Sequence, residues 1–220
     1  MHKFSRKSFV TLCCFFLLMS CKKSKPIDTS LNNLCGDSVY FAGDSFFYDK
    51  PWFEGIPTAY QKRMAVKVFR QGMPGAGSTA IADSFEKRRS YFSAPVFVWA
   101  GQNNNWSSET VKEDILRITK GHSKFYVFEL TSGNLPDRWI GTEYRRHNDQ
   151  LNNEIEEMVG KEHFIRVIEP MGKLAITAQD SIDVQHGSIP SSYLSDWLHP
   201  NEKGNEAIVN SLLQHLKPCR

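Results

Sequence analysis

Residues 35–47 read Cys-Gly-Asp-Ser-Val-Tyr-Phe-Ala-Gly-Asp-Ser-Phe-Phe, and they contain the tripeptide Gly-Asp-Ser twice. The second copy, 43–45, directly follows the apolar run 39–42, which is typical of a short buried strand. The first copy precedes that run and ends at Ser38, which we interpret as a turn residue. Open parallel sheets bind ligands at the carboxyl ends of their strands. Position alone therefore favours Ser45 as the reactive serine.

The rest of the chain alternates short apolar runs with longer amphipathic stretches. Runs rich in β-branched and aromatic residues predict further strands at 64–69, 95–100, 124–130 and 163–168. Apolar residues at helical spacing predict helices at 107–120, 143–159 and 201–216. Strands that alternate with helices build βαβ units, so we expect an α/β fold with a parallel sheet of about five strands, covered on both faces.

Composition and charge are typical of one soluble globular domain. The chain has 220 residues, of which 40% are hydrophobic and 23% are charged. Its formal net charge of +3 comes from Lys3, Arg6 and Lys7, because removing these from the 27 basic residues leaves 24 against 24 acidic ones. Binding to nucleic acid driven by bulk charge is therefore not expected.

The first 21 residues have the pattern of a secretory leader. A basic start is followed by the apolar run 9–19, which is shorter than the roughly 20 residues needed to span a bilayer. Residues 18–21, Leu-Met-Ser-Cys, resemble the bacterial lipobox, which implies cleavage before Cys21 and lipidation of its thiol. Plain secretion is the alternative. Residues 22–34 are predicted to form a polar tether to a membrane surface, and 35–220 the folded domain.

Cysteine usage supports export from the cytoplasm. Cys13 and Cys14 leave with the leader and Cys21 is the lipid site, so Cys35 and Cys219 remain. Two remaining cysteines in an oxidising compartment favour a disulfide. A final helix of about 16 residues, roughly 24 Å long, would return the chain to the edge where the first strand begins. We therefore predict a Cys35–Cys219 bridge and a protein anchored at the bacterial cell envelope, in the periplasm or on the outer surface.

A candidate base for Ser45 lies near the other end of the chain. Residues 195–200 read Ser-Asp-Trp-Leu-His-Pro, so Asp196 precedes His199 by three positions. This spacing lets both side chains lie on one side of a single turn. The carboxylate can then hold one imidazole nitrogen while the other faces a serine. A helix-start residue beside Pro200 is the alternative interpretation of His199.

Gly43-Asp44-Ser45 after the first strand and Asp196-x-x-His199-Pro200 near the end resemble the SGNH/GDSL hydrolases. These are serine esterases and lipases with a flavodoxin-like, three-layer α/β/α fold. Two further blocks of that family are similar to segments of this chain, namely 70–75, which ends at Gly75, and 101–103, which reads Gly-Gln-Asn. The four blocks follow one another in the family order between about 36 and 216.

The resemblance implies a set of roles for these residues. Ser45 would be the nucleophile, His199 the general base and then acid, and Asp196 its orienting carboxylate. The backbone N–H groups of Ser45 and Gly75 and the side-chain amide of Asn103 would form the oxyanion hole. No cofactor is implied. The reaction would be hydrolysis of a small or carbohydrate ester, with a short acyl group such as O-acetyl.

Two positions depart from the family pattern. Residue 104 is Asn where the third block often has Asp, so we expect the hydrogen-bond support of that loop to differ. Residue 46 is Phe where the family name implies Leu, and this bulkier wall would narrow the acyl pocket. The alternatives to an esterase are a non-catalytic surface-binding module on the same fold and an acyltransferase that uses the same triad.

Other ligand classes have little support. Segment 72–79 has the glycine spacing of a P-loop, but Ser78 replaces the required lysine, so we expect no nucleotide. The seven histidines form no His-x-x-x-His pair and the cysteines no Cys-x-x-Cys pair, so we expect no metal. Trp52, Phe53 and Trp106 follow the first and third blocks, where packing is favoured over a place in a substrate cleft.

Overall fold

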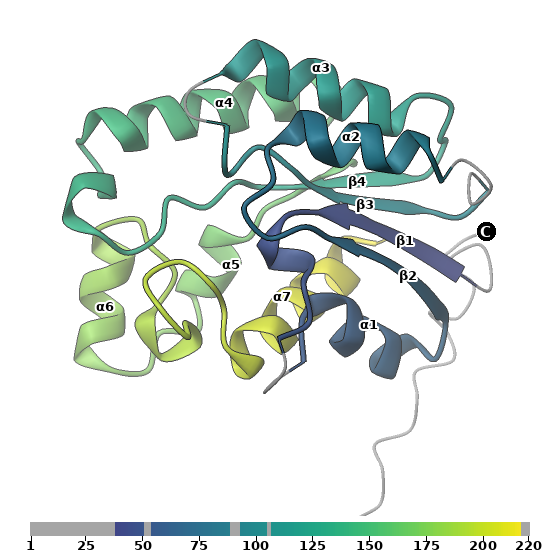
Figure 1. The fold of residues 1–220 in the computed structure, drawn as a ribbon. Helices are drawn as coiled ribbons and strands as arrows, with labels where there is room; N and C mark the ends of the chain where they lie inside the picture. Colours follow the sequence, from purple (N-terminus) through teal and green to yellow (C-terminus); the bar gives the residue numbers. More distant parts are fainter. Residues whose placement is uncertain (1–37, 51–53, 89–92, 105–106, 217–220) are drawn as a thin grey trace, which may run out of the picture.

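The computed structural model describes residues 38–50, 54–88, 93–104 and 107–216, and they form one parallel sheet with helices on both faces (Figure 1). The strands are β1 (Ser38–Gly43), β2 (Lys67–Gly72), β3 (Val96–Trp99), β4 (Phe125–Phe128) and β5 (Phe164–Ile165). They lie in the order β2-β1-β3-β4-β5, and every neighbouring pair is parallel. The predicted five-stranded parallel sheet is confirmed.

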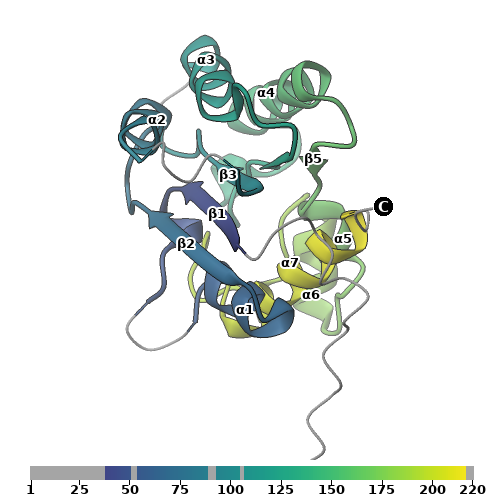
Figure 2. The same ribbon diagram turned by 90° about the vertical axis from the view of Figure 1, so that its right-hand side faces the viewer.

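The helices form two layers around this sheet. They are α1 (Ile56–Met64), α2 (Ser78–Glu86), α3 (Ser108–Thr119), α4 (Glu143–Val159), α5 (Ile168–Gly172), α6 (Ala178–Gln185) and α7 (Glu202–His215). Helices α2, α3 and α4 cover one face, whereas α1, α5 and α7 cover the other, with α6 beside α5 (Figures 1 and 2). Short 3-10 helices η2 (Ser45–Phe47), η4 (Pro136–Arg138) and η5 (Ser191–Tyr193) lie in the connecting segments. The three-layer α/β/α architecture is therefore also as predicted.

Aromatic side chains on and beside β1, β3 and β4 form a cluster within the buried core. Phe41 of β1 lies 4.7 Å from Phe97 of β3, measured between ring centres, and 4.9 Å from Phe47. Trp99 stacks on Phe128 of β4 at 4.9 Å with almost parallel planes. Large rings that are buried on both faces of a sheet give most of the hydrophobic stabilisation of such a domain. We call this cluster of rings, which includes Phe41, Phe46, Phe47, Phe97, Trp99 and Phe128, the aromatic floor. It lies next to the carboxyl ends of β1 and β3.

Two predicted strands differ from the observed ones. The second was expected at 64–69 but is found at 67–72, because Met64 ends α1, and Ala65 then reverses the chain in a left-handed conformation with a φ of 54°. Edge strand β2 exposes Lys67 and Arg70 and ends in Arg-Gln-Gly, so its polar end looked like a loop in the sequence. The fifth strand was expected at 163–168 and is limited to 164–165, since α5 starts at Ile168.

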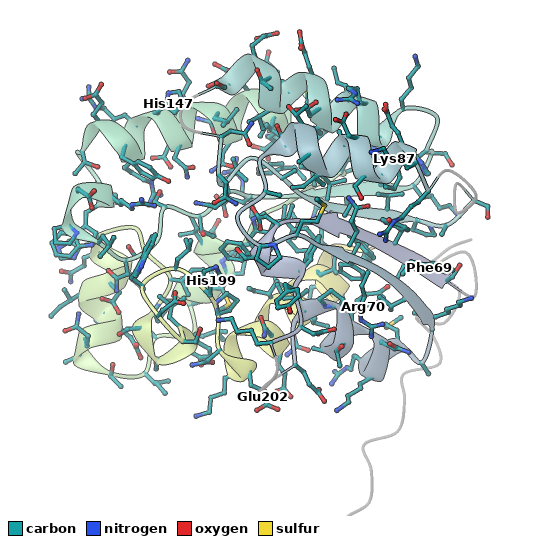
Figure 3. The ribbon with its side chains drawn as sticks, in the orientation of Figure 1. Phe69, Arg70, Lys87, His147, His199 and Glu202 are labelled. Carbon is teal, nitrogen blue, oxygen red and sulfur yellow. The ribbon has the colours of Figure 1, made fainter. Side chains whose placement is uncertain are left out.

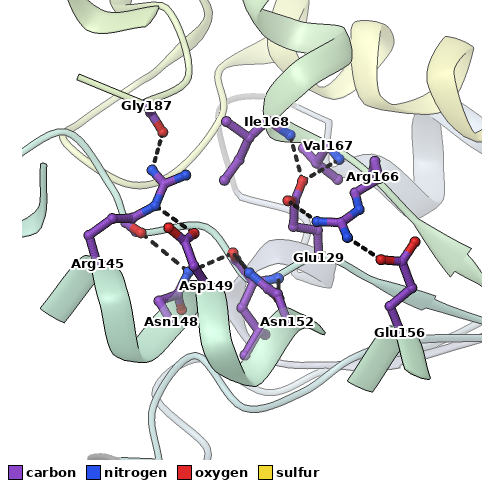
Figure 4. Close-up of polar contacts among 12 residues, drawn as sticks. Glu129, Arg145, Asn148, Asp149, Asn152, Glu156, Arg166, Val167, Ile168 and Gly187 are labelled. Atoms are coloured by element: carbon purple, nitrogen blue, oxygen red, sulfur yellow. Dashed lines mark hydrogen bonds and ion pairs between the residues drawn. The ribbon is translucent and has the colours of Figure 1, made fainter. Parts of the chain in front are cut away.

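A polar network fixes the segment that follows β4 (Figure 4). The carboxylate of Glu129 accepts hydrogen bonds from the N–H groups of Val167 (2.7 Å) and Ile168 (2.8 Å). The side chain of Asn152 on α4 accepts one from the N–H of Leu130 and donates one to its carbonyl. Buried backbone groups beyond the end of a strand need such partners. They hold α4 against the carboxyl end of β4.

The strand order creates a switch point next to β1. The chain passes from β1 to β2 on one side and then returns to β3 on the other side of β1. The connections that follow β1 and β3 therefore diverge at their carboxyl ends, which is where open sheets of this order bind ligands. Among the described residues, no helix has the length and apolar character needed to cross a membrane.

Candidate active site

Ser45 lies at the switch point because β1 ends two residues before it. Gly43 is the last residue of β1, and a Cβ added there would lie 2.7 Å from the carbonyl oxygen of Trp99 and from the ring of Phe47. Only glycine therefore permits this close approach. Asp44 then accepts a hydrogen bond from the N–H of Phe46 at 3.1 Å and so caps η2, which begins with Ser45.

Three residues predicted as a triad are brought together in one hydrogen-bonded chain. Nε2 of His199 lies 2.9 Å from Oγ of Ser45, although the two residues are 154 positions apart. Nδ1 of His199 lies 2.9 Å from Oδ2 and 3.1 Å from Oδ1 of Asp196. Figure 3 shows His199 beyond the carboxyl ends of the strands. An ionised carboxylate accepts a hydrogen bond from Nδ1–H, so the proton stays on Nδ1 and Nε2 is left as the acceptor for the serine hydroxyl.

The turn that holds Asp196 favours its ionised form. Burial opposes ionisation, but the N–H groups of His199 (2.7 Å) and Leu198 (2.8 Å) both donate to Oδ1, and the imidazole contacts the same carboxylate. Together these hydrogen bonds lower the pKa of Asp196 below its ordinary value. The carboxylate is therefore charged at neutral pH and fixed in position by its own turn.

The turn itself is anchored on both sides. Asn201 caps α7 by accepting from the N–H of Gly204, and its amide donates to the carbonyl of Leu194 at 3.1 Å. On the other side, Nζ of Lys50 donates to Oγ of Ser195 at 3.0 Å and lies 4.0 Å from Oδ2 of Asp196. Sequence reasoning missed Lys50, because a single lysine after the first block has no distinguishing neighbour.

The surroundings of Asp44, next to the candidate nucleophile, favour its protonated form, in contrast to those of Asp196. Its side chain is fully buried, and its Oδ2 has no hydrogen-bond partner in the part of the chain that the structure describes. Burial raises the pKa of Asp44 from 3.8 to about 7, against the smaller effect of the hydrogen bond from Phe46. This carboxyl group is therefore mostly protonated below neutrality, and it does not compete with Asp196 for the imidazole.

The loops after β1, β2 and β3 are joined by hydrogen bonds. The N–H of Met73 donates to the carbonyl of Gly43 (2.9 Å), and the N–H of Asp44 donates to that of Trp99 (3.1 Å). The amide of Asn103 donates to the carbonyl of Ala76 at 3.1 Å, which ties the third block to the second. The three segments from which we predicted oxyanion donors are therefore held at one edge.

The predicted donors keep N–H groups that could face a ligand. Gly75 is exposed on the loop after β2 with a φ of 74°, a left-handed conformation that favours glycine. Among the described residues, the backbone N–H groups of Ser45 and Gly75 make no hydrogen bond. A primary amide has two N–H donors, so Asn103 retains one after it binds Ala76.

Asn104, the first departure from the family pattern, supports its loop in a specific way. Its Oδ1 accepts from the N–H of Ser78 at 2.8 Å, and its Nδ2 donates to Oγ of the same serine at 2.7 Å. The hydroxyl of Ser78 donates its one proton to Asp114 at 2.7 Å, so it needs a donor on its other side. An amide at position 104 provides that donor, whereas a carboxylate would not.

Phe46, the second departure, is buried in the aromatic floor. Its ring stacks on Trp99 at 4.3 Å and lies 5.6 Å from the ring of His199. It therefore supports the imidazole from below.

A cavity that the sequence did not reveal lies beside the triad. It has a volume of about 230 Å³, is open on one side, and is lined by the third block, residues of α3 and α4, and the turn between Asp196 and His199. Its walls include Asn103, Arg138, Tyr144, His147, Trp197 and Leu198. The one clue in the sequence was Trp197, a large apolar side chain placed between the predicted carboxylate and base.

Several predicted features fall elsewhere. Cys21, Cys35, Cys219, Trp52, Phe53 and Trp106 lie outside the described residues, so their predictions stay predictions. Ser38 is the first residue of β1, at the amino edge of the sheet, rather than a turn residue. Within the described ranges, no three His, Cys, Asp or Glu residues are grouped as metal ligands would be.

Comparisons with known proteins agree on the architecture. No protein-family model matches the chain, and a search of curated proteins finds no match. A protein from Desulfitobacterium hafniense, provisionally described as a lipolytic protein of the G-D-S-L family, is similar with a TM-score of 0.62 and 14% identity, over 82% of this chain and 100% of its own. A member of the lipolytic G-D-S-L family from Veillonella parvula gives 0.54 and 18%, over 80% and 96%.

A catalytic mutant of Axe2, an acetylxylan esterase from Geobacillus stearothermophilus, gives a TM-score of 0.59 and 13% identity, over 84% of this chain and 97% of its own. At such identities the likeness establishes the fold, which this chain shares with solved proteins described as lipolytic or as esterases.

Proposed function

We propose that this protein is a serine hydrolase of the SGNH type, which cleaves carboxylic esters through an acyl-enzyme on Ser45. The observation that carries the proposal is the hydrogen-bonded chain from Ser45 through His199 to Asp196 at the switch point of the sheet. The descriptions of the structural neighbours as lipolytic proteins and esterases support the same class of reaction.

In the first proposed step, Oγ of Ser45 attacks the ester carbonyl carbon while its proton moves to Nε2 of His199. Negative charge develops on the carbonyl oxygen, where the N–H groups of Ser45 and Gly75 and the amide of Asn103 would stabilise it. A single donor of this kind typically contributes about 3 kcal/mol to the barrier reduction. Asp196 stabilises the imidazolium through its contact with Nδ1.

The tetrahedral intermediate then loses the alcohol, whose oxygen takes the proton from His199. Water attacks the acyl-enzyme by the same path, with His199 accepting its proton and returning that proton to Oγ as the acid leaves. No step of this sequence requires a cofactor. A sugar hydroxyl in place of water would make the same machinery an acyltransferase.

The proposed substrate is a small or carbohydrate ester with a short acyl group such as O-acetyl. A structural neighbour that is itself an acetylxylan esterase supports both the acetyl group and a sugar as the alcohol, whereas Phe46 is buried against Trp99 and does not bear on the length of the acyl chain. The proposed location is the bacterial cell envelope, with the domain held by a lipid on Cys21. The leader pattern of residues 1–21 supports this location.

A fluorophosphonate probe, which reacts with activated serines, tests the proposal. We expect labelling of the unaltered protein and of the Ser38→Ala variant, but not of Ser45→Ala. Ser38 is the matched control because the same Gly-Asp-Ser tripeptide surrounds it at the opposite end of β1. A folded, unaltered protein that takes no label would contradict the hydrolase and favour the non-catalytic binding module. Mass spectrometry of products formed with and without added sugar would separate hydrolysis from acyl transfer.

Fatty-acid labelling of cells tests the location separately. The unaltered protein should incorporate the lipid, whereas Cys21→Ser should not. An exported protein without lipid would support plain secretion instead.

A further inference from the structure

The cavity beside the triad contains a cation without a counter-ion. The guanidinium carbon of Arg138 lies 4.3 Å from the ring centre of Tyr144 and 4.6 Å from that of Trp197. Its Nη1 donates to the hydroxyl of Tyr144 at 3.2 Å, and its Nε is buried without a hydrogen-bond partner among the described residues. The guanidinium lies over both rings, and the Tyr144 hydroxyl is the one acceptor that its N–H groups have among the described residues, so donors remain for an anion.

Four of the other described arginines are paired with carboxylates, whereas Arg63, Arg88 and Arg146 form no ion pair within the described ranges but are exposed to solvent, unlike Arg138. Arg70, Arg117, Arg145 and Arg166 each form an ion pair with Asp or Glu. Arg138 forms none within the described ranges, and no residue that lines the cavity is Asp or Glu. Residues 105–106, Asn and Trp, which stand in the sequence between the lining residues 104 and 107, carry no charge either. A partly buried charge of this kind is costly unless an anion completes it.

Three other polar side chains of the cavity, those of Gln102, Asn104 and Asn148, already have partners, whereas Asn103 keeps one N–H, which we assign to the oxyanion hole. Both ends of the Gln102 amide bind the backbone of Thr131, and both N–H groups of Asn148 have acceptors, of which one is the carbonyl of Leu130. The amide of Asn104 binds Ser78. The remaining N–H donors of Arg138 are therefore the groups by which this cavity would bind an anionic ligand. The apolar side chains of the wall, such as Leu151 and Leu198, suit the carbon skeleton of an organic acid.

The arginine is held rigidly relative to the triad. The N–H of Asn134 donates to the carbonyl of Trp197 at 2.6 Å, and the indole N–H of Trp139 donates to the side chain of Asn134 at 3.2 Å. A Cβ on Gly133 would lie 2.8 Å from the Trp197 ring, so these two segments are in close contact. The segment that carries Arg138 and the turn that carries His199 are thus one packed unit.

We infer that this cavity binds a carboxylate of the ester substrate, and that Arg138 holds it through paired N–H···O hydrogen bonds. The inference rests on the proposed function and deepens it, since it assigns the substrates to the anionic esters. Asn103 lines both the cavity and the proposed oxyanion hole. A carboxylate bound in the cavity would therefore be separated from the reacting carbonyl by only a few bonds of the substrate. The carboxylate could belong to the alcohol, as in an acetylated uronic acid, or to the acyl group, as in a hemiester of a dicarboxylic acid.

Two pairs of substrates distinguish these sources. Methylumbelliferyl hemisuccinate differs from the butyrate only by a carboxylate in place of the terminal methyl group. An O-acetylated methyl glucuronoside differs from the acetylated methyl glucoside by a carboxylate in place of the hydroxymethyl group. For one pair, we expect kcat/KM of the unaltered protein to favour the acid by about tenfold or more, as a charge-assisted hydrogen bond predicts.

Arg138→Gln should lower this acid-to-neutral ratio by about 10- to 100-fold, and Arg138→Lys should lower it less, because lysine keeps the charge but loses the paired geometry. Arg146→Gln is the matched control, since it removes the same charge from an exposed position on α4 and should leave the ratio unchanged. No preference for either acid, or an equal ratio in Arg138→Gln, would overturn the inference.

Calorimetry with the free acids separates this inference from the proposed function. Succinate or methyl glucuronoside should bind the unaltered protein and fail to bind Arg138→Gln. Binding that depends on Arg138 in a protein without turnover or probe labelling would keep the carboxylate site and reject the hydrolase. Turnover of neutral esters, with no binding of the free acids and no preference for acidic esters, would keep the hydrolase and reject the carboxylate site.

Discussion

Two carboxylates flank the candidate nucleophile, and their surroundings are opposite. Asp44 is buried against the core with one oxygen unpartnered, and burial raises its pKa to about 7. Asp196 lies in a half-exposed turn, where converging N–H groups and the imidazole lower its pKa despite partial burial. Below neutral pH the site therefore carries its negative charge on Asp196 and not on Asp44. His199 therefore meets one ionised carboxylate below neutral pH.

Removing the charge of Asp196 should have the largest effect. In Asp196→Asn, Oδ1 can still accept from Leu198 and His199, so the turn keeps its shape, but Nδ1 of His199 loses its anionic partner. We expect kcat/KM to fall by about 10³- to 10⁴-fold, as for other triads that lose this carboxylate. Ester hydrolysis with circular dichroism as the folding control checks this. A loss below tenfold would exclude the orienting role.

Asp44→Asn should change stability rather than turnover. Between about pH 4 and 7 the folded protein keeps a proton on Asp44 that the unfolded chain releases, so stability falls as the pH rises through this window. The asparagine variant should lack that fall, which amounts to as much as about 4 kcal/mol. Its Tm should therefore exceed that of the unaltered protein at pH 8 by more than at pH 5.

Asp180 offers a control of opposite sign for that experiment. Burial alone would raise the pKa of Asp180, but hydrogen bonds from the hydroxyl and N–H of Ser192 and from Ile176 and Thr177 lower it. Its contribution is present above its unfolded pKa and is lost as the pH falls. Asp180→Asn should thus flatten the acid side of the profile. An unchanged profile in Asp44→Asn would show that Asp44 titrates normally.

A third carboxylate can be introduced at position 104, on the loop after β3. Asn104→Asp would place an acceptor against Oγ of Ser78, whose proton is already donated to Asp114. One unsatisfied buried group costs about 1–3 kcal/mol, so the urea midpoint should fall accordingly. Asn153→Asp, at an exposed position on α4, adds the same charge and should be nearly neutral. Equal effects of the two changes would argue against this account of Asn104.

The smallest expected effect concerns the cation near Asp196. Lys50→Met removes the hydrogen bond to Ser195 and the charge 4.0 Å from Asp196. Partly exposed pairs are worth less than about 1 kcal/mol, so kcat/KM should fall only a few-fold, and less in high salt. Lys62→Met, which breaks an exposed pair with Glu54, should leave kcat/KM unchanged. A loss above tenfold would mean that Lys50 acts directly on the substrate.

The sequence predicted the central part of this molecule best. β1 and β3 are continuous apolar runs because they are buried on both faces, and the triad residues stand in short blocks at the ends of elements. β2 was misplaced because an edge strand is only half apolar. The periodicity of α4 and α7 was long enough to be recognised, whereas α5 has only five residues.

The cavity could not be predicted in the same way. Its walls come from the third block, η4, α4 and the turn before α7, and no local pattern links these segments. Arg138 has ordinary neighbours in the sequence, and its unpaired state depends on which side chains the fold brings near it. The pKa values of Asp44 and Asp196 likewise depend on burial and on hydrogen bonds. Neither Gly-Asp-Ser nor Asp-x-x-His reveals these surroundings in the sequence.

The short spacing between Asp196 and His199 has a consequence for the order in which this protein becomes active. Their mutual contact closes within a single turn, whereas the contact between His199 and Ser45 joins residues 154 positions apart. During synthesis from the amino end, Ser45 therefore emerges long before its base exists. Until the segment before α7 docks, the serine is an ordinary alcohol. The moment at which Ser45 begins to react with the probe, during translation or refolding, would therefore report when the contact between His199 and Ser45 forms.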